Sequence, residues 1–361
     1  MTKGLRGGAE LRPIKEKSFG VVSCVGRTRE PMGKQYKTTY IFGAGASFHA
    51  GYPFVKTMGA QLLAWMRMPR ESVCYDFAGS ADFLEERFGD NIENLFNGVQ
   101  TEIAARQPGY SVFANVYRPC LIEAMRQWFA DIHRHQPAQA YERFAAEIVM
   151  PGDRVITFNY DISLESKLRQ SGKWAIGDGY GFRVQGLPTG STVKILKLHG
   201  SINWLAILFA GMQSGIITAA SPMGSRPVFG TDDLTALGYV GLADPDFTRP
   251  SGAVQPLVLP TNKKQFFFDT NLGRHWETFW SHMWRSAKRT LQSSERIVVC
   301  GYGMYPIDRR GRNLLLKGAL AGDIEVCCGG ESPRIVQELR DHGRRVRQAE
   351  QTYFEQWVSA Q

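Results

Sequence analysis

The stretch TTYIFGAGAS, residues 38–47, decides the fold class of this chain. Its first five residues are β-branched or aromatic, which is typical of a buried strand, and Gly43 and Gly45 then mark a tight turn. Glycines in such a turn let the backbone approach an anion, and Ser47 adds a hydroxyl donor beside it. Taken alone, the pattern is equally typical of an ordinary tight turn. It predicts a strand that enters a nucleotide-type turn.

Helix-like and strand-like segments alternate on the C-terminal side of this turn. Helical periodicity extends over about residues 55–150, and helices are also expected at 276–291 and 333–342. Apolar runs predict strands at residues 154–158, 193–198, 297–300, 324–328 and 345–347. Strands separated by helices predict an α/β fold with an open parallel sheet covered on both faces.

The remaining segments define the expected domain organisation. The 361-residue chain has a net charge of +9. Residues 1–37 carry nine basic and three acidic side chains, so most of this charge lies in them, and they are expected to form a basic N-terminal extension. Residues 38–361 are expected to form one domain, with a helical insertion at about 55–150 and an irregular insertion at about 205–258. The nearly balanced charge of this domain, without helix-turn-helix or zinc-finger spacing, argues against a dedicated DNA-binding protein.

Cysteine usage and hydropathy point to a cytoplasmic protein without a structural metal. The six cysteines form no C-x-x-C pair, which argues against both a zinc ribbon and a disulfide framework. The longest apolar stretch, around residues 202–212, is much shorter than the roughly 20 residues of a membrane span.

Polar residues follow two further expected strands, at the ends where a parallel sheet binds its ligands. Asn159 and Asp161 come directly after the strand at 154–158, and an amide there can hold a ligand hydroxyl or a water. Asp161 is equally well explained as the N-cap of the next helix. His199 follows the strand at 193–198 and titrates in the range that a general base requires, although a lone histidine at a strand end is more often structural.

The order of the motifs resembles the sirtuin-like NAD-binding domain, in its bacterial antiphage-defence branch of NAD-hydrolysing proteins. The motifs are GAGAS with a following GYP, then TFNYD, KLHGS with Trp204, LVLP and GYGMYPID. The resemblance covers about residues 38–342 and implies a Rossmann-like sheet that binds NAD as its substrate and cleaves the bond between nicotinamide and ribose.

The resemblance also implies roles for individual residues. It implies that Asn159, Asp161 and His199 are catalytic, with His199 as the base and with Asn159 and Asp161 beside the nicotinamide ribose. Of the cofactor-binding residues, it places Ala44, Gly45 and Ser47 at the diphosphate, Gly301 and Gly303 along the ribose–phosphate path, and Gly329 and Gly330 toward the adenosine. The further expected cofactor-binding residues are Gly43, Ala46, Thr157, Ser201 and Tyr302.

Departures from the family pattern narrow the expected reaction. Deacylating sirtuins have a zinc ribbon and an Asp-Phe-Arg triplet, whereas here Phe54, Val55 and Lys56 follow the GYP motif. Without these deacylase features, water is the expected acceptor, with ADP-ribose and nicotinamide as products. Gly303 is a further departure, since many relatives have serine at this position. The alternatives are a non-catalytic module that senses NAD or ADP-ribose, and a protein deacylase or ADP-ribosyltransferase.

Partners are expected from the resemblance alone. A chain of this kind is expected to form a homo-oligomer and to work beside a separate protein, such as a hexameric DNA-translocating ATPase or an Argonaute-like protein. Nucleic acid is then contacted only indirectly, and no membrane is involved. Asp90, Ile92 and Glu93 resemble a short acidic motif of such relatives, and a solvated helix face is the expected setting for them.

Overall fold

The computed structural model describes residues 36–69, 75–105, 111–182, 188–207, 239–242, 273–319 and 322–361. Within these ranges six strands form one open sheet in which every neighbouring pair is parallel. In spatial order the strands are β3 (Lys194–Lys197), β2 (Arg154–Thr157), β1 (Tyr36–Phe42), β6 (Ser294–Cys300), β7 (Asp323–Cys327) and β8 (Val346–Gln348). The predicted α/β class with a Rossmann-like open parallel sheet is confirmed.

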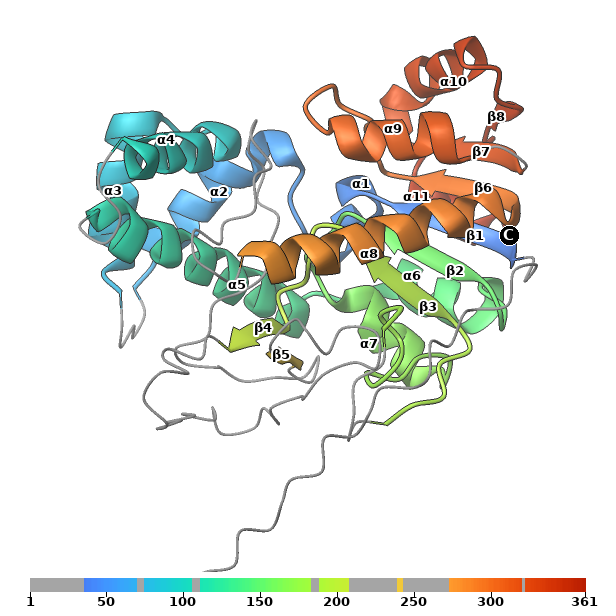
Figure 1. The fold of residues 1–361 in the computed structure, drawn as a ribbon, viewed down its shortest axis with the longest axis horizontal. Helices are drawn as coiled ribbons and strands as arrows, with labels where there is room; N and C mark the ends of the chain where they lie inside the picture. Colours follow the sequence, from blue (N-terminus) through green and yellow to red (C-terminus); the bar gives the residue numbers. More distant parts are fainter. Residues whose placement is uncertain are drawn as a thin grey trace, which may run out of the picture.

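Helices and an aromatic cluster cover the sheet, in keeping with the near-continuous apolar character of its strands. Helix α8 (Gly273–Gln292) packs along β1, β3 and β6 and crosses in front of the strands in Figure 1. Alternate side chains of β1, Tyr40 and Phe42, pack against Phe144 and Phe354, with ring centroids 4.8 Å and 5.1 Å apart. Every residue of β2 is buried between these layers.

The segment predicted to be helical, about 55–150, contains two units with different packing partners. Helices α2 (Val55–Arg67), α3 (Phe77–Phe88), α4 (Ile92–Ala104) and α5 (Arg118–His135) pack on one another with the π-helical turn η2 (Phe113–Tyr117), and they lie beside the sheet in Figure 1. Helix α6 (Gln139–Arg143) and the π-helical turn η3 (Phe144–Ile148) instead pack beside the sheet: α6 contacts α7 (Ser163–Gln170) and α11 (Phe354–Ser359), and η3 contacts α7.

The remaining helices follow individual strands. They are α1 (Ala44–Ser47), η1 (Phe48–Ala50), α7 (Ser163–Gln170), α9 (Arg309–Gly318), η4 (Gly329–Glu331), α10 (Ser332–Asp341) and α11 (Phe354–Ser359). Helix α9 was not predicted, because its arginines and glycines give no clear period. Its N-cap is Asp308, whose carboxylate accepts the Gly311 N–H at 3.2 Å. Among the described residues, no helix has both the length and the apolar character needed to cross a membrane.

Two predicted segments lie mostly outside the described residues. Of the N-terminal extension only residues 36 and 37 are described, and both belong to β1, which starts before the predicted boundary. Residues 208–238 and 243–258 of the irregular insertion are not described, but β4 (Trp204–Ile207) and β5 (Tyr239–Leu242) pair antiparallel within it. These two short apolar runs escaped the prediction because Gly- and Pro-rich sequence surrounds them.

The strand order places a ligand position at the centre of the sheet. From β1 the chain adds β2 and β3 on one side and then returns to add β6, β7 and β8 on the other. The connections that follow β1 and β6 therefore lead to strands on opposite sides, β2 and β7, and the carboxyl edge between them is the switch point where open α/β sheets bind ligands.

Candidate functional site

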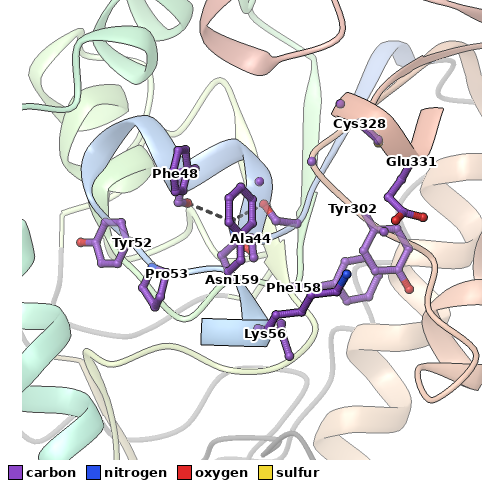
Figure 2. A pocket seen from close by; sticks show the side chains of 18 of the residues that line it. Ala44, Phe48, Tyr52, Pro53, Lys56, Phe158, Asn159, Tyr302, Cys328 and Glu331 are labelled. Carbon is purple, nitrogen blue, oxygen red and sulfur yellow. Dashed lines mark hydrogen bonds between the residues drawn. The ribbon is translucent and has the colours of Figure 1, made fainter. Parts of the chain in front are cut away.

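A cavity of about 520 Å³ opens at this carboxyl edge, a size typical of small-molecule and cofactor sites. Loops after β1, β2, β3, β6 and β7 line it, together with residues of α2, α4 and α5 and the segment that leads into α11. Figure 2 shows its wall around Ala44, Asn159 and the Phe158–Tyr302 pair. Four of these loops, those after β1, β2, β3 and β6, carry the glycine and polar residues singled out in the sequence.

The glycine turns after β1 and β6 touch one another. Gly43 N–H donates to the Cys300 carbonyl and Gly45 N–H to the Gly301 carbonyl, both at 3.0 Å. A Cβ on Gly301 would lie 2.1 Å from the Ala46 nitrogen, and Gly301 has φ +63°, so only glycine fits this contact. Because Ala46 N–H also donates to the Gly43 carbonyl, three amides of the predicted diphosphate turn are already hydrogen-bonded within the protein.

Asn159 is held in one orientation by its amide group. Its Nδ2 donates to the Gly43 carbonyl and to Ser47 Oγ, each at 2.9 Å, and its main-chain N–H donates to Thr157 Oγ1 at 3.1 Å. With both amide protons used, Oδ1 is the atom with which Asn159 can accept a hydrogen bond from a ligand hydroxyl or a water.

Ser47 is the centre of this hydrogen-bond network. Its hydroxyl donates to Asp161 Oδ2 at 2.6 Å and accepts from Asn159, so the hydroxyl of Tyr141, 2.8 Å away, must donate to it. The single Ser47 proton is therefore directed to Asp161 and not to the cavity. Tyr141, on α6, carried no sequence signal because it lies 94 residues from Ser47 in the chain.

Asp161 forms hydrogen bonds with both of its carboxylate oxygens, although the N-cap residue of α7 is Ile162 and not Asp161. Its Oδ1 accepts the Ser163 N–H at the start of α7, at 3.1 Å, while its Oδ2 accepts the Ser47 hydroxyl. Its carbonyl accepts a hydrogen bond from Lys197 Nζ, which also pairs with Glu165 at 2.7 Å. The loop that bears Asn159 and Asp161 therefore rests on a buried ion pair.

His199 enters the cavity from the end of β3. Its ring packs edge-on against Phe158, with centroids 5.1 Å apart, and Phe158 stacks on Tyr302 at 4.2 Å. Its Nε2 lies 3.9 Å from Asp308 Oδ2, and 13% of its side chain is exposed. The ring is thus fixed by aromatic contacts but remains accessible from the cavity.

The predicted site residues divide into two groups. Asn159, Asp161 and His199 line the cavity with Gly43, Ala44, Gly45, Ser47, Gly301, Tyr302, Gly303, Gly329 and Gly330. Ala46, Thr157 and Ser201 are buried and do not line it. Thr157 supports the Asn159 backbone, and Ser201 Oγ donates to the Tyr160 carbonyl at 3.4 Å.

From the sequence, several cavity residues were missed, and one of them, Glu93, was expected on a solvated helix face. Glu93 lines the cavity and is half-buried, so it does not belong to a fully solvated face. Four aromatic side chains of the cavity are 38–52% exposed: Phe48, Phe54, Tyr305 and Tyr353. A local pattern does not reveal them, because they come from segments that meet only in the folded chain. No group of three or more His, Cys, Asp or Glu residues in the described part of the chain is arranged to hold a metal ion.

His49 makes the stability of the folded protein depend on pH. Its ring lies between Tyr141 and Phe354, and its Nε2 is buried without a hydrogen-bond partner among the described residues. Burial lowers the pKa of His49 from 6.5 to about 4, against the opposing effect of the Asp161 charge. The unfolded chain therefore binds a proton here as the pH falls below 6.5, whereas the folded protein resists it until about pH 4.

The lowered pKa of His49 contributes to the pH dependence of the free energy of unfolding. We expect the protein to keep its full stability above pH 6.5, where His49 is neutral in both states, and to lose stability as the pH falls toward 4. Between pH 7 and pH 5 this amounts to a loss on the order of 2 kcal/mol in the free energy of unfolding. Urea unfolding of the wild type and of His49→Phe at both pH values measures it. An equal loss in the two proteins would contradict the assignment.

Comparisons with known proteins give structural matches only. No protein-family model matches the chain, and no curated protein matches it. A Sir2 homologue–NAD complex is 12% identical, with a TM-score of 0.36, over 91% of this chain and 90% of that chain. Sir2Tm bound to a propionylated peptide is 14% identical, with a TM-score of 0.37, over 91% and 92%. A mutant Sir2 homologue–ADP-ribose complex is 14% identical, with a TM-score of 0.34, over 86% and 92%.

Proposed function

We propose that this protein binds NAD and hydrolyses it to nicotinamide and ADP-ribose. The observation that carries the proposal is that Asn159, Asp161 and His199, from the loops after two different strands, line one cavity at the switch point of the sheet. A second support is the motif order, which resembles that of NAD-cleaving sirtuin-like domains.

The residue types suit the chemistry of this reaction. The nicotinamide ring of NAD is a pyridinium cation, so the bond from C1′ to nitrogen breaks with its electron pair going to nitrogen, and no general acid is needed. The sugar that remains resembles an oxocarbenium ion. Water then bonds to C1′ and loses a proton, which His199 takes up and passes to solvent. Asn159 Oδ1 accepts a hydrogen bond from a ribose hydroxyl or from this water.

Water is favoured as the acceptor over an acylated lysine. The sequence contains no C-x-x-C pair for a zinc ribbon, and Phe54, Val55 and Lys56 replace the Asp-Phe-Arg triplet of deacylating sirtuins. Phe54 is 40% exposed and stacks on Phe48 at 4.3 Å, so this segment presents an apolar rim to the cavity. A second candidate, ADP-ribosyl transfer to protein, would yield modified protein instead of free ADP-ribose.

Incubation of the purified protein with NAD tests the proposal. We expect nicotinamide and ADP-ribose to form in equal amounts, and His199→Ala to lower the rate by about 100-fold or more. His342→Ala, an exposed histidine on the far end of α10, serves as the matched control and should retain the wild-type rate. A wild type that binds NAD but releases no nicotinamide, either alone or with the proposed ATPase or Argonaute-like partner, would overturn the proposal. Binding without cleavage is the behaviour of a sensing module.

The biological role that we propose is depletion of NAD in the cytoplasm during phage infection. It rests on the resemblance to the antiphage branch, as do the proposed homo-oligomer and the separate ATPase or Argonaute-like partner. NAD in infected cells should fall with the wild-type gene and its neighbours but not with the His199→Ala variant. Unchanged NAD in both strains would contradict the role without affecting the chemistry.

A further inference from the structure

Asp308 occupies a position that the proposed reaction does not yet use. It is 7% exposed and lies at the end of the loop that connects β6 to α9. Its Oδ1 accepts the Gly311 N–H at 3.2 Å, and its Oδ2 accepts the Tyr302 hydroxyl at 2.7 Å. The same Oδ2 lies 3.9 Å from His199 Nε2. One carboxylate thus caps a helix, holds a cavity tyrosine and faces the candidate base.

The loop that carries Asp308 has a constrained backbone. Met304 has φ +46°, and it is the one non-glycine residue with a positive φ in the described ranges. Its side chain is completely buried, and Asp308 N–H donates to the Tyr305 carbonyl at 2.9 Å. Backbone conformations of this kind persist only where surrounding contacts enforce them, and they cluster at functional sites. The position of Asp308 relative to His199 is therefore fixed by the fold.

We propose that Asp308 is a positioning residue for His199. This inference rests on the proposed function, in which His199 takes a proton. The Asp308 carboxylate favours the imidazole tautomer with its proton on Nε2, so that the other ring nitrogen accepts the proton from water. It also stabilises the imidazolium cation that this transfer creates, because opposite charges about 4 Å apart attract one another in a partly buried site.

Among the described residues, the other ionisable groups named around His199 do not supply this charge. The ring of Tyr160 lies 6.3 Å from the His199 ring between centroids, and Tyr302 stacks on Phe158, which packs against His199. Burial raises the pKa of both tyrosines, so they stay neutral. Asp161 lines the same cavity but binds Ser47 and the Ser163 amide. Arg310, at the start of α9, stacks over Trp284 at 4.6 Å. Asp308 Oδ2, by contrast, lies within ion-pair range of the His199 ring.

Titration of His199 by NMR tests the coupling directly and does not depend on turnover. The seven histidines are labelled with ¹³C at Cε1, and the His199 signal is assigned from its loss in His199→Gln. In Asp308→Asn we expect the titration midpoint of His199 to fall by about one pH unit, since the imidazolium loses its facing anion. An unchanged midpoint would overturn the proposal.

Asp76→Asn is the matched control. Asp76 caps α3 by accepting the Gly79 N–H at 2.9 Å, as Asp308 caps α9, but it does not line the cavity. It should leave the His199 midpoint unchanged. Should Asp308→Asn fail to fold, Asp308→Ser retains a capping oxygen, removes the charge and is expected to give the same shift.

Kinetics separate this inference from the proposed function. In a wild type that releases nicotinamide, Asp308→Asn should lower kcat about tenfold, change KM less than about twofold and move the acid limb of the rate profile to lower pH. An active wild type with an unaltered profile in Asp308→Asn would overturn the positioning role. A wild type that releases no nicotinamide would overturn the proposed function, and the NMR midpoint would then decide alone whether Asp308 is coupled to His199.

Discussion

Replacement of Asn159 with alanine is expected to lower the rate of nicotinamide release at saturating NAD by two to three orders of magnitude, about the effect of removing one preorganised hydrogen-bonding group from an active site. The change removes Oδ1, the atom left to accept a hydrogen bond from ribose or water. It also leaves the Gly43 carbonyl and Ser47 Oγ without the Nδ2 donor that each now has at 2.9 Å. A radiometric or chromatographic assay of nicotinamide measures the rate.

The fold should survive this change, because Asn159 is only half-buried and its network retains the Tyr141–Ser47–Asp161 hydrogen bonds. Circular dichroism and NAD affinity therefore accompany the assay. Asn94→Ala, at an exposed position of α4 outside the cavity, should leave the rate unchanged. If Asn159→Ala hydrolyses NAD at the wild-type rate, Asn159 is not a catalytic residue.

Replacement of Lys197 with methionine is expected to cause the largest loss of stability. Lys197 and Glu165 are each about 1% exposed, and the Lys197 ammonium pairs with Glu165 at 2.7 Å while it donates to the Asp161 carbonyl. Burial raises the pKa of Glu165, and the Lys197 charge opposes that effect. Without Lys197 the carboxylate is buried without a cation, which typically costs about 3–5 kcal/mol. Chemical unfolding measures the loss.

A second substitution tests the cause of this loss. In the double variant Lys197→Met with Glu165→Gln no charge is left buried, so most of the stability should return. Lys167→Met is the control for a more exposed ion pair. Lys167 lies 3.2 Å from Glu142, and the Glu142 side chain is 65% exposed, so the change should lower the free energy of unfolding by less than about 1 kcal/mol. If the double variant is no more stable than Lys197→Met, an uncompensated charge is not the cause.

The sequence predicted the sheet better than the elements around it. Each expected strand, from 38–42 to 345–347, overlaps a strand of the sheet, because a buried parallel strand is a compact apolar run whose signal is local. Helix α9 and the β4–β5 pair were missed, since arginine, glycine and proline obscure their periods. Helix α9 depends on the cap at Asp308, which a helical period does not show.

By itself, the sequence determined the alternation of strands and helices, and it placed Asn159, Asp161 and His199 at strand ends, where ligands bind. Only the tertiary structure decided what these residues do with their hydrogen bonds. Ser47 gives its proton to Asp161, Tyr141 reaches Ser47 from 94 residues away, and the Asp308 carboxylate faces His199. The physical reason is that local periodicity reports the burial of a segment, whereas hydrogen-bond partners are set by which loops meet at the edge of the sheet.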